Sequence, residues 1–303
     1  MARALKEQTP MTSKIFSAAV ASDIARFFAE DDLSRNLFYT AQLPDEDVSC
    51  QLFCKSDLVI AGLPFFTEAF KYLSNSHTSP LSLNEESILR FEGQKISKSS
   101  SPAIEFTLPF SLALTGERIA LNLLQHASSI ATMARGFAEK AAPINIAILD
   151  TRKTTPGLRS LEKYAVRVGG GQNHRMGQSD QWMIKDNHKH FFGGIKGALQ
   201  FFKSMGGFYN PIVVEIHSLE EMQEAIKLGI THVMLDNFKP SSIKEPVKIK
   251  PANITIELSG GIRLENIDQY LIQGVDAISV GALTYDAPSV DISLKYHRKG
   301  QSK

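Results

Sequence analysis

The chain has 303 residues, of which 43% are hydrophobic and 21% charged, and this composition is that of a globular protein with a sizeable buried core. Its 33 Lys and Arg residues against 32 Asp and Glu residues give a net charge of +1, which indicates neither a nucleic-acid-binding nor a membrane-surface protein. No run approaches the ~20 apolar residues that a membrane-spanning helix needs, and the N-terminus shows no signal peptide pattern, so we expect a cytoplasmic protein.

Residues 1 to about 120 give mixed signals. They contain a helical pattern over 17–30, an apolar run over 58–66 and a Ser-rich segment over 97–102, and little in them suggests chemistry. The two cysteines, Cys50 and Cys54, have no second pair near them, so we expect reduced thiols instead of a zinc site or a disulfide framework.

From about residue 119 the pattern changes to an Ala-rich helix through 140, followed by short β-type runs that alternate with helical stretches. This alternation favours parallel strands with helical crossovers. Ser218 and Glu221 form a capping box for a helix that runs to Leu228 before Gly229, and a helical stretch over 264–273 is expected to end at Gly274. The predicted strands cover residues 144–150, 183–186, 212–216, 232–236, 254–258 and 277–281.

Each of these predicted strands is largely apolar and has a polar, charged or glycine residue at or next to its end. A single charge there could simply mark the exit of a strand into solvent, but six in series favour a common edge. Because active sites in α/β barrels and open α/β sheets lie at the carboxyl ends of the strands, the pattern predicts a site at that edge. The end residues are Asp150, Lys185 with Asp186, Glu215, Asp236, Glu257 and Gly281.

Cationic side chains gather in the segments around these strand ends. An Arg side chain can grip a carboxylate with two parallel hydrogen bonds and a Lys side chain adds a point charge, so a converging set suits a ligand with several negative groups. Surface ion pairing is the alternative for any one of them. The set comprises Arg118, Arg152, Lys153, His174, Arg175 and Lys185.

Two carboxylates, Glu215 and Asp236, end consecutive predicted strands. They could hold Mg²⁺ through water and substrate oxygens, or stabilise positive charge that develops at a sugar carbon, and Glu257 could join them. Alternatively, either could pair with a neighbouring Lys.

Glycine-rich turns follow the last two predicted strands. Ser259, Gly260 and Gly261 follow one, and Gly281 and Ala282 follow the other. Exposed backbone N–H groups at such turns can hold a phosphate group, although a Ser-Gly-Gly sequence alone could be a simple turn.

Taken together, these motifs resemble the signature set of the quinolinate phosphoribosyltransferases, in that family's order and spacing. The resemblance runs from about residue 115 to 294, and its most specific parts are DTRKTTPG and KDNH, whereas residues 30–35 and 74–101 depart from the family pattern. The motifs are DTRKTTPGLR at 150–159, EKYAV at 162–166, GGGQNHR at 169–175, IKDNH at 184–188, MLDN at 234–237, SGGI at 259–262 and ISVGAL at 278–283.

The resemblance implies an α/β fold with an incomplete α/β barrel and an N-terminal open α/β sandwich domain. We therefore expect the sandwich over residues 1–124, joined by the C-terminal segment 285–303, and the barrel over 125–284. It also implies a homodimer with shared active sites, which could assemble further.

The resemblance further implies a pentosyltransferase that moves phosphoribose from phosphoribosyl pyrophosphate to quinolinate with loss of CO₂, giving nicotinate mononucleotide for NAD biosynthesis. Quinolinate would be held by Arg152, His174, Arg175 and Lys185, with Arg118 coming from the other subunit. Phosphoribosyl pyrophosphate would meet Lys153, Lys185, Glu215 and Asp236, with its 5-phosphate on Ser259, Gly260, Gly261, Gly281 and Ala282. The cofactor Mg²⁺ would be held mainly by substrate and water near Glu215 and Asp236.

Other readings remain open at this point. The fold could belong to the related protein of molybdenum transport, or to a phosphoribosyltransferase for another pyridine carboxylate. A Schiff-base aldolase would use Lys185 as its amine, although the arginine cluster argues against it. A non-catalytic phosphate-binding barrel would need neither Glu215 nor Asp236.

Overall fold

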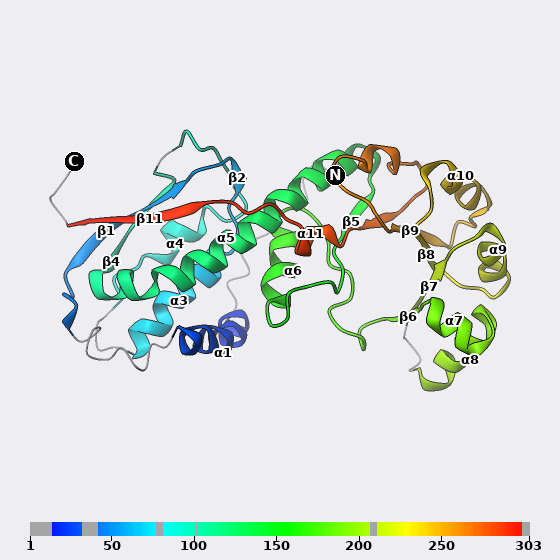
Figure 1. The fold of residues 1–303 in the computed structure, drawn as a ribbon, viewed down its shortest axis with the longest axis horizontal. Helices are drawn as coiled ribbons and strands as arrows, with labels where there is room; N and C mark the ends of the chain where they lie inside the picture. Colours follow the sequence, from blue (N-terminus) through cyan, green and yellow to red (C-terminus); the bar gives the residue numbers. More distant parts are fainter. Residues whose placement is uncertain (1–13, 32–41, 77–80, 101, 207–210, 299–303) are drawn as a thin grey trace. The chain divides into compact units, whose positions relative to one another are not determined.

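The computed structural model describes residues 14–31, 42–76, 81–100, 102–206 and 211–298. Most of the divergent stretch 30–35 and the end of the basic C-terminal tail lie outside the described residues. The chain forms two compact units, one built from residues within 1–133, 160–170 and 287–303, and the other from 134–159 and 171–286 (Figure 1). The predicted domain boundary at 124/125 falls within a long helix and stays a prediction.

The first unit contains a three-stranded antiparallel sheet with β1 (Asp47–Cys54) between β4 (Ile104–Pro109) and β11 (Ile292–Arg298). Every second residue of β1 is buried, because successive side chains of a strand point to opposite faces. Strand β11 comes from the C-terminal segment, which therefore completes the N-terminal sheet as the predicted sandwich requires. A second, small sheet pairs β2 (Leu58–Val59) with β3 (Lys95–Ile96).

Five helices accompany these sheets among the described residues. They are α1 (Lys14–Glu30), α3 (Leu63–Ser76), α4 (Glu85–Leu89), α5 (Phe110–Ala141) and α6 (Arg159–Val168). Helix α1 packs on α3, where the rings of Phe28 and Tyr72 stack with their centroids 5.5 Å apart. Helix α5 begins earlier than predicted, at Phe110, and its buried alanines allow close packing. Both cysteines are free and buried in this unit, and burial raises the pKa of Cys50 to about 12 and that of Cys54 to about 11.

A single carboxylate caps the start of α3. Glu92 Oε1 accepts hydrogen bonds from Gly62 N (2.8 Å) and from the Tyr164 hydroxyl (2.9 Å), and Oε2 accepts one from Leu63 N (2.9 Å). Enclosure of the carboxyl group nevertheless raises the pKa of Glu92 to about 7, although each of these hydrogen bonds lowers it. The cap therefore couples the stability of this unit to pH.

The Glu92 cap predicts a stability effect with a pH signature. Glu92→Ala should cost about 2 kcal/mol, since it leaves backbone donors of α3 without acceptors. The pKa of Glu92 is about 7 in the folded protein, against an ordinary value of 4.5. Between these two pH values the folded protein binds more protons than the unfolded one, so the free energy of unfolding should fall as pH rises from 4.5 through 7. Thermal unfolding of wild type and Glu92→Gln at about pH 5.5 and 8 measures this, and an equal pH dependence in both proteins would contradict it.

The second unit is built on six parallel strands in the order β5-β10-β9-β8-β7-β6. Their bounds are β5 (Ala147–Leu149), β6 (Trp182–Ile184), β7 (Ile212–Ile216), β8 (His232–Asp236), β9 (Thr255–Ser259) and β10 (Ala277–Ser279). Strands β6 to β10 lie side by side in chain order, as in a barrel, while β5 pairs with β10 and not with β6. The sheet is thus an α/β barrel that remains open between β5 and β6, as expected.

Helices and turns connect these strands. They are η2 (Ala142–Ile144), α7 (Asp186–Phe192), α8 (Ile195–Met205), α9 (Leu219–Lys227), α10 (Pro240–Ile249), η3 (Ile267–Gln269) and α11 (Ala282–Tyr285). The predicted capping residues of α9 are confirmed with a shift of one residue, because Ser218 Oγ accepts from Glu221 N, whereas Glu221 Oε2 accepts from the N–H of His217, the residue before the N-cap, in place of that of Ser218. In the part of the chain that the structure covers, no helix has both the length and the apolar character needed to cross a bilayer.

The helix predicted over 264–273 is wrong. The structure forms only the single turn η3 there. Asn266 Oδ1 accepts a hydrogen bond from Arg263 N, and its amide donates to Gly261 O (3.1 Å), so this side chain holds a turn in place of a helical start.

Candidate active site

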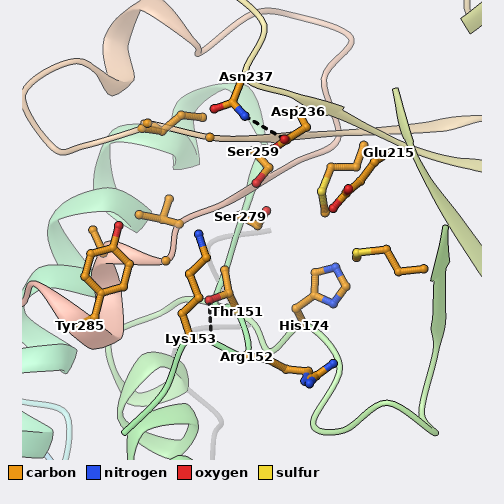
Figure 2. A pocket seen from close by; sticks show the side chains of 18 of the residues that line it. Thr151, Arg152, Lys153, His174, Glu215, Asp236, Asn237, Ser259, Ser279 and Tyr285 are labelled. Carbon is orange, nitrogen blue, oxygen red and sulfur yellow. Dashed lines mark hydrogen bonds between the residues drawn. The ribbon is translucent and has the colours of Figure 1, made fainter. Parts of the chain in front are cut away.

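A pocket of about 570 Å³ opens at the carboxyl ends of the strands of the second unit (Figure 2). The buried side chains of Met183, Val213 and Met234 form an apolar cluster in this unit, and two of them, Met183 and Met234, line the pocket. The predicted site residues that line it are Arg152, Lys153, His174, Arg175, Lys185, Glu215, Asp236, Ser259, Gly260, Gly261, Gly281 and Ala282. Arg118 is not among them, since it lies exposed on α5 within the other unit.

Asp150 positions the segment that carries His174 and Arg175. It is fully buried at the end of β5, and its carboxylate accepts hydrogen bonds from Asn173 Nδ2 (2.6 Å) and His174 N (2.9 Å). The ring of His174 is held as well, with Nδ1 accepting from Arg175 N (2.7 Å) and Nε2 lying 3.3 Å from Glu257 Oε2. The sequence singled out Asp150 as a strand end and allowed Glu257 to join Glu215 and Asp236. In the structure Glu257 does not line the pocket with those two carboxylates, and both Asp150 and Glu257 contact the predicted ligand-binding His174.

Two guanidinium groups supply strong positive charge. Arg175 donates to Gln181 O (2.8 Å), and its pKa is lowered by burial and then by the positive charge of Arg152. The Nε atom of Arg152 is buried without a hydrogen-bond partner. Because an unpaired buried donor is costly, this arrangement suits an anionic ligand that would complete its hydrogen bonding.

Lys185 and Glu215 face each other across the ends of adjacent strands β6 and β7, and their side chains form an ion pair. Glu215 is buried, whereas the Lys185 side chain is about half exposed (47%). Lys185 also begins α7, where its backbone N–H donates to His188 Nδ1 (3.0 Å). Opposite charges therefore meet at one wall of the pocket.

Asp236 stands at the end of the next strand, β8. Its Oδ2 atom accepts a hydrogen bond from Asn237 Nδ2 (2.8 Å) and lies 3.5 Å from His217 Nε2. Asn237 adopts a left-handed conformation (φ 57°), which Asn tolerates better than most residues, and its backbone N–H donates to Ser259 O (2.8 Å). Asn237 was quoted in a motif but not predicted as a site residue, and His217 was missed altogether.

The turn after β9, predicted to hold a phosphate group, contains two glycines in the left-handed region. Gly260 (φ 100°) and Gly261 (φ 65°) are both left-handed, and a Cβ atom on Gly260 would overlap the Asn237 side chain. A Cβ atom on Gly261 would meet nothing within 4 Å. Gly260 is therefore required by close approach as well as by its backbone angle, whereas Gly261 is required by the angle alone.

The two glycines provide a matched pair of variants. Gly260→Ala should raise the KM for phosphoribosyl pyrophosphate at least about ten-fold and cost about 2–3 kcal/mol of stability, because the turn must move. Gly261→Ala should cost only about 1 kcal/mol. Thermal unfolding and steady-state kinetics of both proteins measure the difference, and equal effects would contradict the close approach of Asn237.

Thr151 and Tyr285 also line the pocket without having been predicted, and Tyr285 is largely exposed. Thr151 Oγ1 accepts from Lys153 N (3.0 Å), while Thr284, which does not line the pocket, donates from Oγ1 to Lys153 O (2.6 Å). Thr151 belongs to the DTRKTT motif, and its place next to the predicted site residue Arg152 could have identified it as a pocket residue. Tyr285, the last residue of α11, had none of these signals, because it lies outside the motifs that the sequence offered.

No group of three or more His, Cys, Asp or Glu side chains among the described residues is arranged to hold a metal ion. Glu215 and Asp236 supply carboxylate oxygens of the kind that Mg²⁺ prefers. A Mg²⁺ ion at this edge would therefore need further ligands from substrate and water, and its binding stays a prediction.

The open α/β barrel has three features at the ends of its strands: a cationic wall, a carboxylate wall and a glycine-rich turn suited to phosphate. This combination is typical of an enzyme that acts on polyanionic phosphate compounds. Sequence comparison gives the family. The profile of the quinolinate phosphoribosyl transferase N-terminal domain matches residues 33–128, and that of the C-terminal domain matches residues 130–295. The chain belongs to the quinolinate phosphoribosyl transferase family.

Individual relatives agree with this assignment. The chain is 40% identical over 268 residues to a probable nicotinate-nucleotide pyrophosphorylase (carboxylating) of Bacillus subtilis, covering 88% of this chain and 90% of that protein. It is 38% identical to the rat nicotinate-nucleotide pyrophosphorylase (carboxylating), with 82% of each chain covered. The solved structure of the Ehrlichia chaffeensis nicotinate-nucleotide pyrophosphorylase matches with a TM-score of 0.81 at 29% identity, covering 95% of this chain and all of that one.

Proposed function

We propose that this protein transfers phosphoribose from phosphoribosyl pyrophosphate to quinolinate, with release of pyrophosphate and CO₂, and so makes nicotinate mononucleotide for NAD biosynthesis in the cytoplasm. The observation that carries the proposal is the pocket itself, in which four cationic side chains face two carboxylates beside a glycine turn. The relatives named nicotinate-nucleotide pyrophosphorylase support the same reaction. A Schiff-base aldolase built on Lys185 would not need that set of charges.

Quinolinate carries two carboxylates, and the cationic wall is suited to both. Arg152 has an unpaired buried Nε atom, and it lies close enough to Arg175 that its positive charge, after burial, helps to lower the pKa of Arg175. Together with His174 and Lys185 they bind the acid groups and orient the pyridine nitrogen toward the sugar. Nicotinate has one carboxylate fewer, so it should fail to replace quinolinate as the phosphoribosyl acceptor.

Phosphoribosyl pyrophosphate occupies the remainder of the pocket. Its 5-phosphate accepts hydrogen bonds from backbone N–H groups of the turns at Gly260, Gly261 and Gly281, next to Ser259 and Ala282. Lys153, whose backbone is fixed by Thr151 and Thr284, supplies charge to the phosphate groups.

Loss of pyrophosphate leaves positive charge on the ribose ring. Glu215 and Asp236 stabilise that charge, because their carboxylates are fixed before the reaction begins. Mg²⁺ near Glu215 and Asp236, held mainly by substrate and water, would supply positive charge to the departing pyrophosphate. Lys185 is released from Glu215 when it binds an anionic substrate group, which exposes the Glu215 carboxylate to the sugar.

Attack of the pyridine nitrogen on the ribose C1 atom makes the ring cationic. When the carboxylate next to that nitrogen leaves as CO₂, the electron pair of its C–C bond stays on the ring carbon, where the adjacent positive nitrogen stabilises it before a proton is taken up. The residues around the acid group then need only to orient and desolvate it.

We further propose a homodimer in which Arg118 of one subunit serves the pocket of the other. Arg118 is an exposed cation on α5 and does not line the pocket of its own barrel unit. An exposed Arg can complete a carboxylate site across a two-fold interface.

Mixed dimers test this sharing. If Arg118→Ala and Lys185→Ala proteins are unfolded and refolded together, about half of the dimers should be mixed, and each mixed dimer should contain one intact site. The mixture should recover roughly a quarter of wild-type activity, although each variant alone is inactive. No recovery in a sample shown to contain mixed dimers would contradict the sharing.

A further inference from the structure

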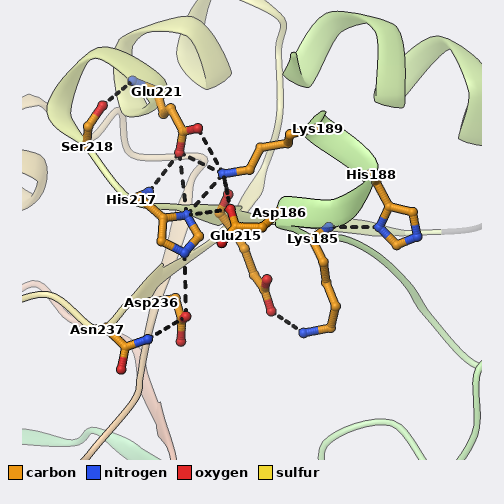
Figure 3. Close-up of polar contacts among 10 residues, drawn as sticks. All are labelled: Lys185, Asp186, His188, Lys189, Glu215, His217, Ser218, Glu221, Asp236 and Asn237. Atoms are coloured by element: carbon orange, nitrogen blue, oxygen red, sulfur yellow. Dashed lines mark hydrogen bonds and ion pairs between the residues drawn. The ribbon is translucent and has the colours of Figure 1, made fainter. Parts of the chain in front are cut away.

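A polar network that the proposed reaction does not use lies behind the two carboxylates (Figure 3). It joins the end of β7 to α7 and α9 and consists of Lys189, His217 and Glu221, with Asp186 at its edge. The network reaches a pocket carboxylate at His217, whose Nε2 atom lies 3.5 Å from Asp236 Oδ2. No member of this network was predicted as a binding or catalytic residue.

Lys189 is the centre of the network. Its side chain is only 8% exposed, and its Nζ atom lies 2.8 Å and 2.9 Å from the two Glu221 carboxylate oxygens and 3.1 Å from the backbone oxygen of Glu215. It also lies 3.0 Å from His217 Nδ1. A lysine buried in this way is fixed by acceptors on three sides.

The position of Lys189 sets the direction of the hydrogen bonds of His217. A lysine ammonium group can only donate, so His217 Nδ1, 3.0 Å from Nζ, must be the acceptor. Asp186 Oδ1 lies 3.1 Å from the same Nδ1 atom, but it also lies 3.1 Å from Lys189 Nζ, which can satisfy it. In a neutral His217 ring, the contact with Lys189 favours the tautomer with its proton on Nε2, the atom that faces Asp236.

Glu221 fixes the backbone at the same place. Its Oε2 atom accepts from His217 N (2.7 Å) while its own N–H donates to Ser218 Oγ (3.2 Å). The capping box that begins α9 thus also holds the residue that faces Asp236. Both the ring and the backbone of His217 are set by this network.

The geometry points to His217 as a positioning residue for Asp236, and we propose that its Nε2–H group, together with the Asn237 amide, holds Oδ2 so that Oδ1 faces the sugar. Both contacts are made to Oδ2, so the other oxygen is left for the ligand. The inference rests on the proposed function, because it assigns Asp236 its role in that reaction.

Kinetics of three variants test the role. His217→Leu should lower kcat about ten-fold or more and leave the KM for quinolinate within about two-fold, since the cationic wall is untouched. His217→Gln, which can place an amide N–H near the position of Nε2, should keep kcat within about three-fold of wild type. The control is His232→Leu, because His232 sits at the opposite, amino end of β8 with Nδ1 2.8 Å from Thr255 Oγ1. It should leave kcat unchanged.

A kcat for His217→Leu within two-fold of wild type, or an equal loss in the Leu and Gln variants, would overturn the proposal. A second measurement uses the wild-type protein alone, so it depends neither on the folding of a variant nor on enzymatic activity. In ¹⁵N-histidine-labelled wild-type protein, the ring nitrogens of His217 should show the Nε2–H tautomer by NMR, and the Nδ1–H tautomer would overturn the assignment. If wild type made no nicotinate mononucleotide, the proposed function would fail, whereas the tautomer would still decide the geometry.

Discussion

Replacing Arg152 or Arg175 by Ala should weaken quinolinate binding about 30-fold or more while the fold stays intact. Each side chain lies in the pocket, and Arg152 has a buried Nε atom without a partner, so its charge is available to the ligand. A bidentate contact between Arg and a carboxylate in a partly dry site is worth on the order of 2–5 kcal/mol, and the remaining cations cannot reproduce its geometry.

The measurement is calorimetric titration of quinolinate into each purified variant, with thermal unfolding as the check on the fold. Arg167→Ala is the matched control, because Arg167 is exposed in the last turn of α6 and does not line the pocket. It should bind quinolinate like wild type. Near-normal affinity in both pocket variants would remove these arginines from the binding site.

Asp236→Asn should lower kcat about 100-fold while changing quinolinate affinity little. Asn is nearly the same size and keeps the contact with its neighbours, but it loses the negative charge that matters most when the ribose becomes cationic. Glu215→Gln should act in the same direction, with the added effect that Lys185 loses its ion-pair partner.

Steady-state kinetics with both substrates varied separate the two effects. Asp268→Asn serves as the control, since Asp268 is an exposed carboxylate paired with Lys140 at 2.6 Å, away from the pocket. It should leave kcat unchanged. A turnover rate for Asp236→Asn equal to that of wild type would show that the carboxylate is only structural.

The strands of the second unit could be predicted from sequence because each combines a short apolar run with a polar end. Glu215 and Asp236 end β7 and β8, and Lys185 follows β6 directly, so the parallel pairing brings all three to one edge. The α9 helix was equally clear, because Ser218 and Glu221 make a local capping box. Residues close together in the sequence were therefore sufficient to predict these strands and this helix.

Other features depend on contacts that no local pattern contains. The stretch after Gly261 has a helical composition, but the Asn266 side chain bonds the backbone around it and forms a turn. His217 and Lys189 lie 28 residues apart in sequence and meet only because β6 and β7 are neighbours. The proposed role of Arg118 depends on a second subunit, which no single chain reveals.

The central claim is that phosphoribosyl transfer and decarboxylation occur together in this pocket, and quinolinate labelled with ¹³C in the carboxylate next to the ring nitrogen tests it most directly. With purified protein, phosphoribosyl pyrophosphate and Mg²⁺, the label should appear in CO₂ in amounts equal to the nicotinate mononucleotide formed. Omitting phosphoribosyl pyrophosphate should abolish both products, because the ring nitrogen is then never made cationic. Labelled CO₂ without phosphoribosyl pyrophosphate, or a mononucleotide that keeps the label, would contradict the account.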